Sequence, residues 1–392
     1  MYTTRLIDEV WSRDRCAGCA MCVAACSKQV LYWDGAEHPR LRTIRKSIGI
    51  STFDLDTCSF CEHFCEVACP RLEPAARWQP LAQMSARAVG VLPGGEPNDV
   101  VRNLLIAARG SGMLDGALLT GADRAGRTRA RIVTSAGEIA ETTGFQLIWT
   151  PLLDALNDAV FDLGLKNSAI VSTPCTSAAV RRMTDSTLGR LAPYRNAIRL
   201  NLALFCTGVH APDAMGKLLA DGMNLALESV QRVTAMPRAG KLRVQLWDGT
   251  THEMDLLEAE KFTRAGCARC DDYLGESADI AVGSVGAPEG YSTLIARTQV
   301  GQAFVQNATT MKLLETVDAV DEDALNRASS EKDRRERAQA FDALQVLMLD
   351  ALRDPQKRAQ VKQQLDLLYG RPRPMTKKED YRNAGCGDCT GC

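Results

Sequence analysis

The sequence predicts a chain of the α+β or α/β class in three parts: a cysteine-rich N-terminal domain, a mixed α/β domain and a helical C-terminal extension. Two observations lead to this prediction. Eight cysteines form two four-cysteine runs before residue 70, and from about residue 89 short apolar strands alternate with helix-like segments. We place the three parts at residues 1–80, 81–320 and 321–392.

The composition argues against several function classes. With 47 basic and 48 acidic residues, the chain has no charge excess that favours nucleic acid or an anionic membrane surface. Aromatic residues make up only 5%, which leaves few stacking platforms for single strands. No apolar run reaches the roughly 18 residues of a membrane-spanning helix, and the N-terminus lacks the apolar segment of a signal peptide. We therefore expect a cytoplasmic protein that is not itself transmembrane and binds no nucleic acid.

Cysteine usage points to metal. A chain of 392 residues with 15 cysteines in a reducing compartment should hold reduced thiols, so clustered spacing favours metal ligation over disulfides. The odd number also rules out complete pairing within the chain. The first run has two residues between its first three cysteines and three before the fourth, which is the bacterial ferredoxin spacing. The two runs are Cys16, Cys19, Cys22 and Cys26, and Cys58, Cys61, Cys65 and Cys69.

These runs resemble the halves of a two-cluster ferredoxin, in which three thiolates hold one [4Fe-4S] cube and the fourth reaches the other. Two departures occur: Ser27 stands where proline usually follows, and three residues rather than two separate Cys61 from Cys65. Zinc with four thiolates is the alternative, since such sites use similar pairs. We expect His63, inside the second run, to be a neighbour of the metal site rather than a ligand.

The remaining elements follow in order. Turn and cap signals predict a turn at Asp34-Gly35, a linker over 71–80, and a helix capped by Asn98 or Asp99. Pro151 should open another helix that Gly164 ends, and Pro212 should open a third. The predicted strands are 116–120, 168–173 and 198–204, and a hairpin at 242–256 turns at Asp248-Gly249.

A third group of cysteines is scattered along the α/β domain. Cys175 and Cys206 each follow a predicted strand, and Cys267 and Cys270 form a Cys-x-x-Cys pair. Because ligands collect at the carboxyl ends of strands in an open α/β sheet, the four thiols could converge on one site. The alternative is that Cys175 and Cys206 are buried small hydrophobic residues.

A glycine-rich stretch lies shortly after the Cys-x-x-Cys pair, where bare backbone can approach a planar cofactor or its phosphates. The stretch 266–298, from Gly266-Cys267-Ala268-Arg269-Cys270 to Ala296-Arg297-Thr298, resembles the beta subunits of coenzyme F420-reducing hydrogenases and their relatives. These relatives include F420H2 dehydrogenase input subunits and F420-dependent formate dehydrogenase beta chains. The resemblance extends, more weakly, back to about residue 89.

The resemblance implies a third [4Fe-4S] cluster and FAD. The family carries a cluster on cysteines in contexts that match Thr173-Pro174-Cys175, Leu204-Phe205-Cys206 and the Cys267/Cys270 pair. In the implied scheme, reduced coenzyme F420 passes a hydride to FAD, and the clusters carry single electrons to a partner redox subunit or ferredoxin-like protein, in either direction. No catalytic acid or base is assigned. The flavin-side residues implied are Gly283, Ser284, Gly286, Pro288, Gly290, Tyr291 and Ser292.

Two family motifs are altered. Relatives carry Gly-Gly-x-x-Thr where this chain has Asn98 to Arg102, with Gly94-Gly95 upstream, and Gly-Thr-Lys-Tyr where it has Gly144 to Leu147. The lysine and threonine that are missing from this chain would suit an anionic cofactor such as F420, although Arg102 could restore a cation. Two alternatives therefore stay open: a ferredoxin-dependent reductase of another substrate, as in the chlorophyll-related branch, and a flavin-less iron-sulfur electron-transfer subunit.

After residue 320 the chain becomes charged and helical. We interpret the charge-rich surface as a solvated helix face and the apolar seam as a docking surface. The three cysteines of the tail are one ligand short of a four-thiolate site. They could bind a metal together with a ligand from a partner, act as redox-active thiols, or belong to a disordered tail. The seam comprises Phe341, Leu344, Leu347, Met348 and Leu352, with a second at Val361, Leu365 and Leu368; the tail cysteines are Cys386, Cys389 and Cys392.

Overall fold

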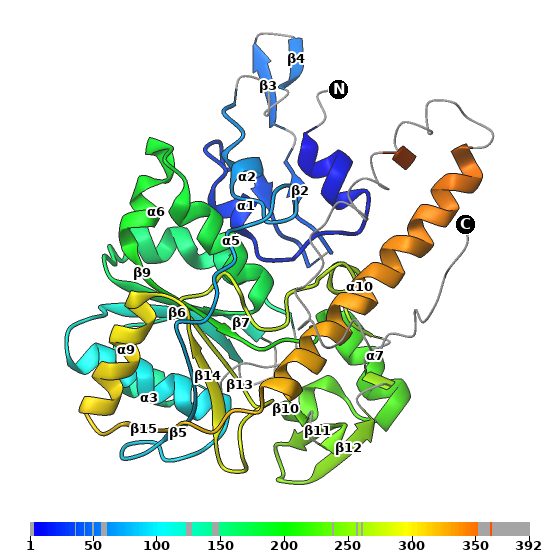
Figure 1. Ribbon diagram of the computed structural model, residues 1–392. Helices are drawn as coiled ribbons and strands as arrows, with labels where there is room; N and C mark the ends of the chain where they lie inside the picture. Colours follow the sequence, from blue (N-terminus) through cyan, green and yellow to red (C-terminus); the bar gives the residue numbers. More distant parts are fainter. Residues whose placement is uncertain are drawn as a thin grey trace, which may run out of the picture. The chain divides into compact units, whose positions relative to one another are not determined.

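The computed structural model (Figure 1) describes residues 4–35, 37–42, 44–48, 51–55, 61–122, 128–142, 149–236, 239–255, 258–259, 262–351 and 361–362. The chain divides into two compact units, Met1–Arg334 and Arg335–Cys392. The contacts discussed below all lie within the first unit. Cys58, the Gly144–Leu147 motif, Leu352, Leu365, Leu368 and the three tail cysteines lie outside the described residues.

An eight-stranded mixed sheet organises the first unit (Figure 1). Its order is β15-β5-β14-β13-β9-β8-β6-β7. The four central strands β13, β9, β8 and β6 run parallel to one another, and every other pair of adjacent strands is antiparallel. The strands are β5 (Ala82–Ala88), β6 (Gly116–Ala122), β7 (Thr128–Val133), β8 (Ser168–Ser172), β9 (Ile198–Leu204), β13 (Ile280–Gly283), β14 (Ser292–Ala296) and β15 (Leu314–Val317).

Both faces of this sheet are covered. Apolar residues of α3 (Pro97–Gly110) and α9 (Gln299–Thr310) pack on one face, around Leu104 and Phe304. On the other face, α5 (Pro174–Asp185) and α6 (Ala192–Ala197) share a core with the cysteine-rich segment, including Met21 and Phe64. This double cover explains why β9 is buried almost throughout, with the polar Asn201 inside, although its sequence alternates.

Several predicted elements are confirmed at these positions. The strands at 116–120, 168–173 and 198–204 are β6, β8 and β9, and α5 begins at Pro174, directly after β8. Pro212 opens α7 (Pro212–Met223), and the predicted hairpin is β11 (Lys241–Leu246) with β12 (Thr251–Asp255). These two strands and β10 (Val230–Met236) form a separate three-stranded sheet on which α7 packs.

One prediction about local structure was wrong, and two are refined by the structure. Glu96, not Asn98 or Asp99, is the N-cap of α3, because Pro97 takes the first helical position and Asp99 completes a capping box. The segment after Pro151 is helical without a break, as predicted, but it changes from a 3₁₀ turn, Leu152–Ala155, through Leu156 and Asn157 to a π-helical turn, Asp158–Asp162. Gly164, with φ +65°, does end it. The segment 71–80 is more than a linker, since Arg71 and Arg77 contact the loop at 266–276.

The N-terminal segment has an internal two-fold pattern. Helices α1 (Met21–Ala24) and α2 (Phe64–Val67) are each preceded by a residue with positive φ, Ala20 at +66° and His63 at +51°. The second run has one residue more than the first, and that residue lies before His63. Helix α2 and the spacing from Cys65 to Cys69 therefore match helix α1 and the spacing from Cys22 to Cys26. Two hairpins complete the segment: β1 (Leu31–Tyr32) with β2 (Arg40–Leu41), and β3 (Ile44–Ile48) with β4 (Ser51–Leu55). In the first, Asp34-Gly35 lies between the paired strands and Gly35 has φ +91°.

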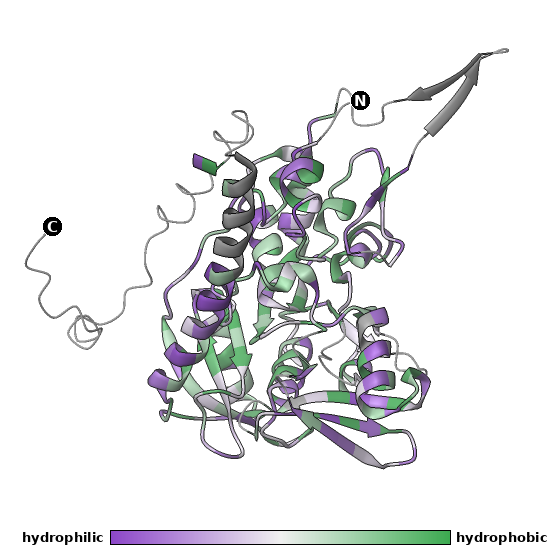
Figure 2. Cartoon of the chain, turned by 90° about the vertical axis from the view of Figure 1, so that its right-hand side faces the viewer, coloured by the Kyte–Doolittle hydropathy of each residue, from purple (hydrophilic) through white to green (hydrophobic). Residues whose placement is uncertain are grey.

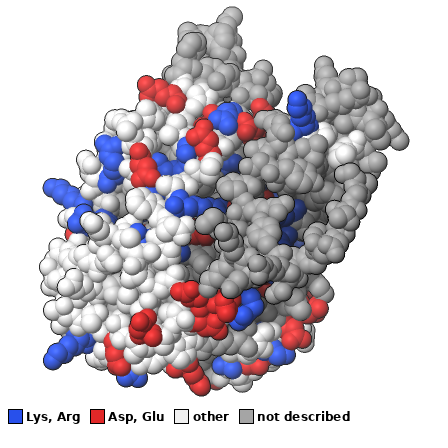
Figure 3. All heavy atoms as spheres, in the orientation of Figure 1, with Lys and Arg blue, Asp and Glu red and all other residues white. Residues whose placement is uncertain are grey.

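Helix α10 (Glu322–Ala351) begins the C-terminal region, and the part of it that Figure 2 colours is largely hydrophilic. Its start is nevertheless docked in the first unit, where Leu325 packs against Ala203, Ala281 and Ile295. The prediction of a solvated charged face was wrong for Lys332, which is 3% exposed. In the part of the chain that the structure describes, no helix is long and apolar enough to cross a membrane. Lys and Arg are interspersed with Asp and Glu on the face in Figure 3, as the balanced composition suggests.

Two short helices complete the described structure, α4 (Ala136–Ala140) and the π-helical Leu6–Trp11, together with 3₁₀ turns at Gly189–Leu191, Leu227–Ser229 and Ala265–Cys267. Ser135 caps α4 and Glu138 returns the contact, which is a complete capping box.

Candidate metal centres

The first thiol set combines both cysteine runs. Three cysteines of the first run and the last of the second line one cavity, together with Trp11, Trp33 and Arg71. In two-cluster ferredoxins, likewise, the fourth cysteine of one run joins the first three cysteines of the other run. Burial raises the pKa of the Cys16 thiol to about 11, and it raises the pKa of the other three as well. The four are Cys16, Cys19, Cys22 and Cys69.

The second set is partly described. Cys26, Cys61 and Cys65 are thiols in the same segment, and Cys58 lies outside the described residues. His63 donates its backbone N–H to the Cys61 sulfur at 3.3 Å, while its ring Nδ1 lies 3.3 Å from a carboxylate oxygen of Glu66. The histidine ring is thus engaged beside this set, as expected of a neighbour.

The third set brings together cysteines from three separate elements. Cys175 is in the first turn of α5, Cys206 follows β9, and Cys267 and Cys270 lie in the loop before β13. Cys175, Cys267 and Cys270 each affect the pKa of Cys206 electrostatically, and Cys175 and Cys270 affect that of Cys267. The four thiols therefore lie close together. Burial raises the pKa of Cys206 and Cys267. At Cys270 burial acts in the same direction, but the cations Lys332 and Arg71 outweigh it and lower the pKa.

The donor chemistry of these sets suits iron-sulfur clusters. Among the described residues, no three cysteine, histidine or carboxylate side chains converge on a point that one metal ion could occupy. The thiols of the first and third sets therefore lie near one another without closing onto a single position. Four soft thiolate donors per set, with no histidine or carboxylate among them, are what iron-sulfur clusters use.

The first and third sets are neighbours. The Cys175 sulfur lies 3.9 Å from the carbonyl oxygen of Ala17, which stands between Cys16 and Cys19. A Cβ on Gly266, beside Cys267, would lie 1.9 Å from the carbonyl oxygen of Cys16. Only glycine allows the two cysteine-bearing backbones to approach so closely.

Arg264 and Trp149 fix this contact between the cysteine-rich segment and the α/β domain. Arg264 is 2% exposed, donates to the carbonyl oxygen of Ala17 at 3.2 Å and pairs with Glu37 at 3.0 Å. Its guanidinium lies over the Trp149 ring, 4.4 Å from the centroid, and the indole N–H donates to the carbonyl oxygen of Gly18 at 2.9 Å. The loop between Cys16 and Cys19 is therefore bonded to the α/β domain at consecutive residues.

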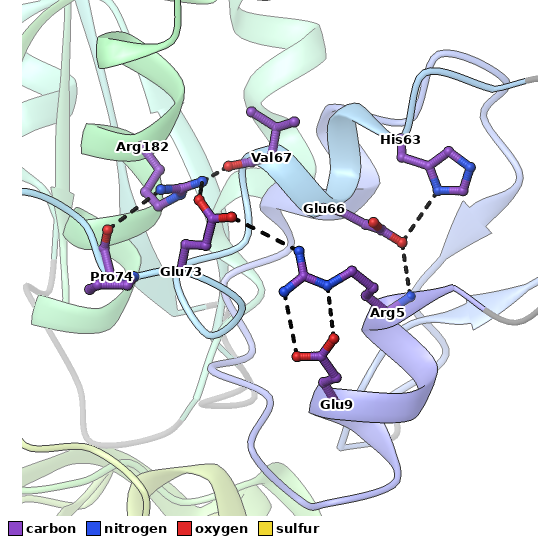
Figure 4. A network of polar contacts seen from close by, with 8 residues as sticks. All are labelled: Arg5, Glu9, His63, Glu66, Val67, Glu73, Pro74 and Arg182. Atoms are coloured by element: carbon purple, nitrogen blue, oxygen red, sulfur yellow. Dashed lines mark hydrogen bonds and ion pairs between the residues drawn. The ribbon is translucent and has the colours of Figure 1, made fainter. Parts of the chain in front are cut away.

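A polar network ties α5 to the second cysteine run (Figure 4). Arg182 of α5 donates to the carbonyl oxygen of Val67 at 2.9 Å and pairs with Glu73 at 3.1 Å. Glu66 accepts the backbone N–H of Arg5 at 2.9 Å. The helix that carries Cys175 is thus connected to both ends of the cysteine-rich segment.

Two cations face the third set, the buried Lys332 and the partly exposed Arg71. Arg71 donates to the carbonyl oxygens of Arg269 at 2.8 Å and Gly266 at 3.1 Å. Lys332 donates to the carbonyl oxygens of Cys206 at 2.6 Å and Asp272 at 2.8 Å. Burial alone would lower the pKa of Lys332, but the nearby thiols of Cys270, Cys206 and Cys267 raise it, so the ammonium stays charged. Lys332 was not among the residues expected from the sequence; the only signal was its position seven residues after Leu325, on the same helix face.

The glycine-rich stretch forms the turn between β13 and β14. A Cβ on Gly283 would lie 1.9 Å from the Phe205 ring, and Gly290 has φ +79° with its carbonyl against Gly95. Ser292 donates to the carbonyl oxygen of Gly95 at 2.7 Å, and Tyr291 donates to Glu315 at 3.2 Å. The remaining predicted flavin-side residues, Ser284, Gly286 and Pro288, lie within the same turn. Packing inside the protein thus accounts for several of these residues, and their flavin role stays a prediction.

A hydroxyl-lined pocket lies at the carboxyl ends of β6 and β8, next to Ala17 and Trp149. Thr173, which precedes α5, has its hydroxyl 3.3 Å from the Cys175 sulfur. The pocket therefore adjoins the third thiol set. Its hydroxyls come from Thr120, Thr150, Ser172, Thr173 and Thr176.

One altered motif can be located. Gly94 and Gly95 directly precede α3, and neither has room for a Cβ. Arg102 donates to the carbonyl oxygen of Thr142 at 3.0 Å and pairs with Asp99 at 2.5 Å. This arginine is thus held by its own helix and by the start of the loop that follows α4.

Comparison with known proteins gives consistent matches. The family described as the C terminus of the coenzyme F420 hydrogenase/dehydrogenase beta subunit matches residues 165–322, and a 4Fe-4S dicluster domain matches residues 15–71. An uncharacterised protein of Methanocaldococcus jannaschii is 30% identical over 84% of this chain and 96% of its own length. The coenzyme F420-dependent sulfite reductase of the same organism is 29% identical over 86% of this chain, which spans 53% of that relative.

A solved structure has the same fold over most of the chain. It is a chain of the F420-reducing [NiFe] hydrogenase complex from Methanosarcina barkeri, with a TM-score of 0.61 and 23% identity. The match covers 68% of this chain and 93% of that one. The match supports the fold described above over about two thirds of this chain.

Proposed function

Because the chain belongs to the coenzyme F420 hydrogenase/dehydrogenase beta subunit family and carries a 4Fe-4S dicluster domain, we propose that it exchanges electrons between reduced coenzyme F420 and a partner redox protein. The observation that carries the proposal is the contact between the first and third thiol sets, at Cys175 and Ala17. Two ligand sets so close together form a continuous route for electrons. A flavin, when bound, would convert the two electrons of a hydride donor into the single electrons that clusters carry.

The chain's own residues support this function in three ways. The first set would hold one cluster, the second set another, and Cys175, Cys206, Cys267 and Cys270 a third. Burial of six of the eleven described thiols limits the access of water to the sites. Arg264 and Trp149 keep the loop between Cys16 and Cys19 against the α/β domain, so the separation of the first and third sets is fixed.

The experiment is anaerobic and uses the full chain. We expect the purified protein to contain flavin and about twelve irons, and reduced F420 to bleach its visible absorbance while oxidised F420 forms. The Cys267→Ser variant should lose roughly four irons. Ala268→Ser, in the same loop, should lose none, because it keeps every thiol. Flavin that does not respond to F420 would refute F420 as the donor and leave a reductase of another substrate.

A second candidate, the flavin-less electron-transfer subunit, is favoured by one observation. Two of the residues predicted to face a flavin, Tyr291 and Ser292, make hydrogen bonds within the protein instead. Under this function the purified chain would bind iron without flavin and would be silent to F420. Chemical reduction by a low-potential donor would still bleach its clusters.

A further inference from the structure

Lys332 is a buried ammonium that the electron-transfer route does not by itself explain. It is 3% exposed and comes from α10, beyond residues 165–322 that match the family. A lysine is almost never fully buried unless something compensates its charge. Here the surroundings are three thiols of the third set and the carboxylate of Asp272.

Hydrogen bonds fix the ammonium of Lys332 beside Cys206 and Asp272. Its two hydrogen-bond acceptors, the carbonyl oxygens of Cys206 and Asp272, are neutral. The Asp272 carboxylate is occupied elsewhere, because its Oδ1 accepts the backbone N–H groups of Gly275 at 2.8 Å and Glu276 at 3.2 Å. The hydrogen bonds of the ammonium thus go to neutral carbonyl oxygens, and its charge lies beside the cysteines of the third set.

We propose that Lys332 acts through the cysteine ligands: its buried positive charge raises the reduction potential of the iron-sulfur group held by Cys175, Cys206, Cys267 and Cys270. Gain of one electron makes that group more negative by one charge, and a nearby cation in a low-dielectric site stabilises the more negative state. The electron comes from a reduced donor of the flavin or F420 type and no bond is made or broken. The inference rests on the proposed third cluster.

The test is a potentiometric titration of the loaded full chain, followed by electron paramagnetic resonance. Lys332→Met keeps the length of the side chain without the charge, and Lys332→Gln keeps a hydrogen-bond donor without the charge. Both should lower the equilibrium constant for reduction of one cluster at least tenfold, about 59 mV for one electron. The other two clusters should keep their potentials. Lys332→Arg, which restores the charge, should stay close to wild type.

Two controls complete the design. Arg327→Met removes a cation from the same helix at a side chain that is 71% exposed, and it should leave every potential unchanged. Cys267→Ser identifies which signal belongs to the third set. If Cys267→Ser removes no signal and no iron, the third cluster and this inference fail together. If the third cluster is present but Lys332→Met and Lys332→Gln leave its potential unmoved, or shift all clusters alike, only the role of Lys332 is overturned.

Discussion

At Gly266 the loop that carries Cys267 and Cys270 meets the backbone of Cys16, and no side chain fits between them. Sequence spacing alone could not show this contact, because nothing in a Cys-x-x-Cys pair says which other loop it touches. The same holds for Cys175 and Cys206. Their places after strands suggested convergence, but buried small hydrophobic residues would have had the same pattern.

We expect Gly266→Ala to destabilise the folded protein by about 1–3 kcal/mol, since the new methyl group must displace a backbone carbonyl. It should also reduce the iron bound by the third set. Chemical unfolding and iron analysis measure the two effects. Gly137→Ala is the matched control, because its Cβ would meet no atom within 4 Å. Equal behaviour of the two variants would mean that the loops have room to separate.

His210 supplies a prediction about pH. Burial lowers its pKa to about 4, and in the described part of the chain neither ring nitrogen has a hydrogen-bond partner. Below about pH 6.5 His210 binds a proton in the unfolded chain but not in the folded chain. The free energy of unfolding therefore falls as the pH drops from 6.5 toward 4, by up to about 3 kcal/mol.

Unfolding midpoints measured between pH 7.5 and 5 should therefore fall less steeply for His210→Gln than for wild type. Loss of iron in acid affects both proteins, and the comparison cancels it. His252→Gln, at an exposed position on β12, should keep the wild-type slope. A slope in His210→Gln as steep as that of wild type would show that His210 is protonated in the folded state.

At the scale of elements, the sequence predicted those with strong local signals. Pro212 marked the start of α7, and Asp248-Gly249 marked the β11–β12 hairpin. Strand β5 was missed, because Ala-Gln-Met-Ser-Ala-Arg-Ala contains no residue with strong strand preference. Its conformation comes from pairing with β14 on one side and β15 on the other. Local propensity could not reveal such a strand.

The start of α10 depends on one apolar anchor. Leu325→Ala should cost about 2–5 kcal/mol, because the leucine is 3% exposed and packs on the sheet. The helix start would then loosen, and hydrogen exchange should accelerate over 322–334. Leu163→Ala, at a residue that is 56% exposed, is the control and should change neither quantity appreciably. Unchanged exchange in Leu325→Ala would show that Lys332 alone holds the helix.

At the scale of the whole molecule, the cysteine-rich segment and the α/β domain lie in one compact unit. The sequence predicted both parts and their order, and the fold confirms this. It did not predict how firmly they join, because Arg264, Trp149 and Arg71 are distant in sequence from the loops they contact. The predicted boundaries at residues 80 and 320 stay predictions.

Arg264→Ala should uncouple the two parts. The change leaves the carbonyl oxygens of Ala17 and Glu37 without their donor, at a cost of about 1–3 kcal/mol. We expect calorimetry to show one unfolding transition for wild type and two for the variant. Arg243→Ala removes an exposed arginine on β11 and should keep the single transition. A single transition in Arg264→Ala would mean that the core shared by α1, α2 and α5 suffices for coupling.

The contact of Gly266 with Cys16 also has a consequence for maturation. In the described part of the fold Cys19, Cys206 and Cys270 are buried and Cys16, Cys175 and Cys267 are partly exposed, so little of the first or third set is exposed to solvent. We therefore expect clusters to be delivered to these two sets before the cysteine-rich segment docks on the α/β domain. A factor that loads iron and sulfide would then act on a chain in which these two parts are still apart.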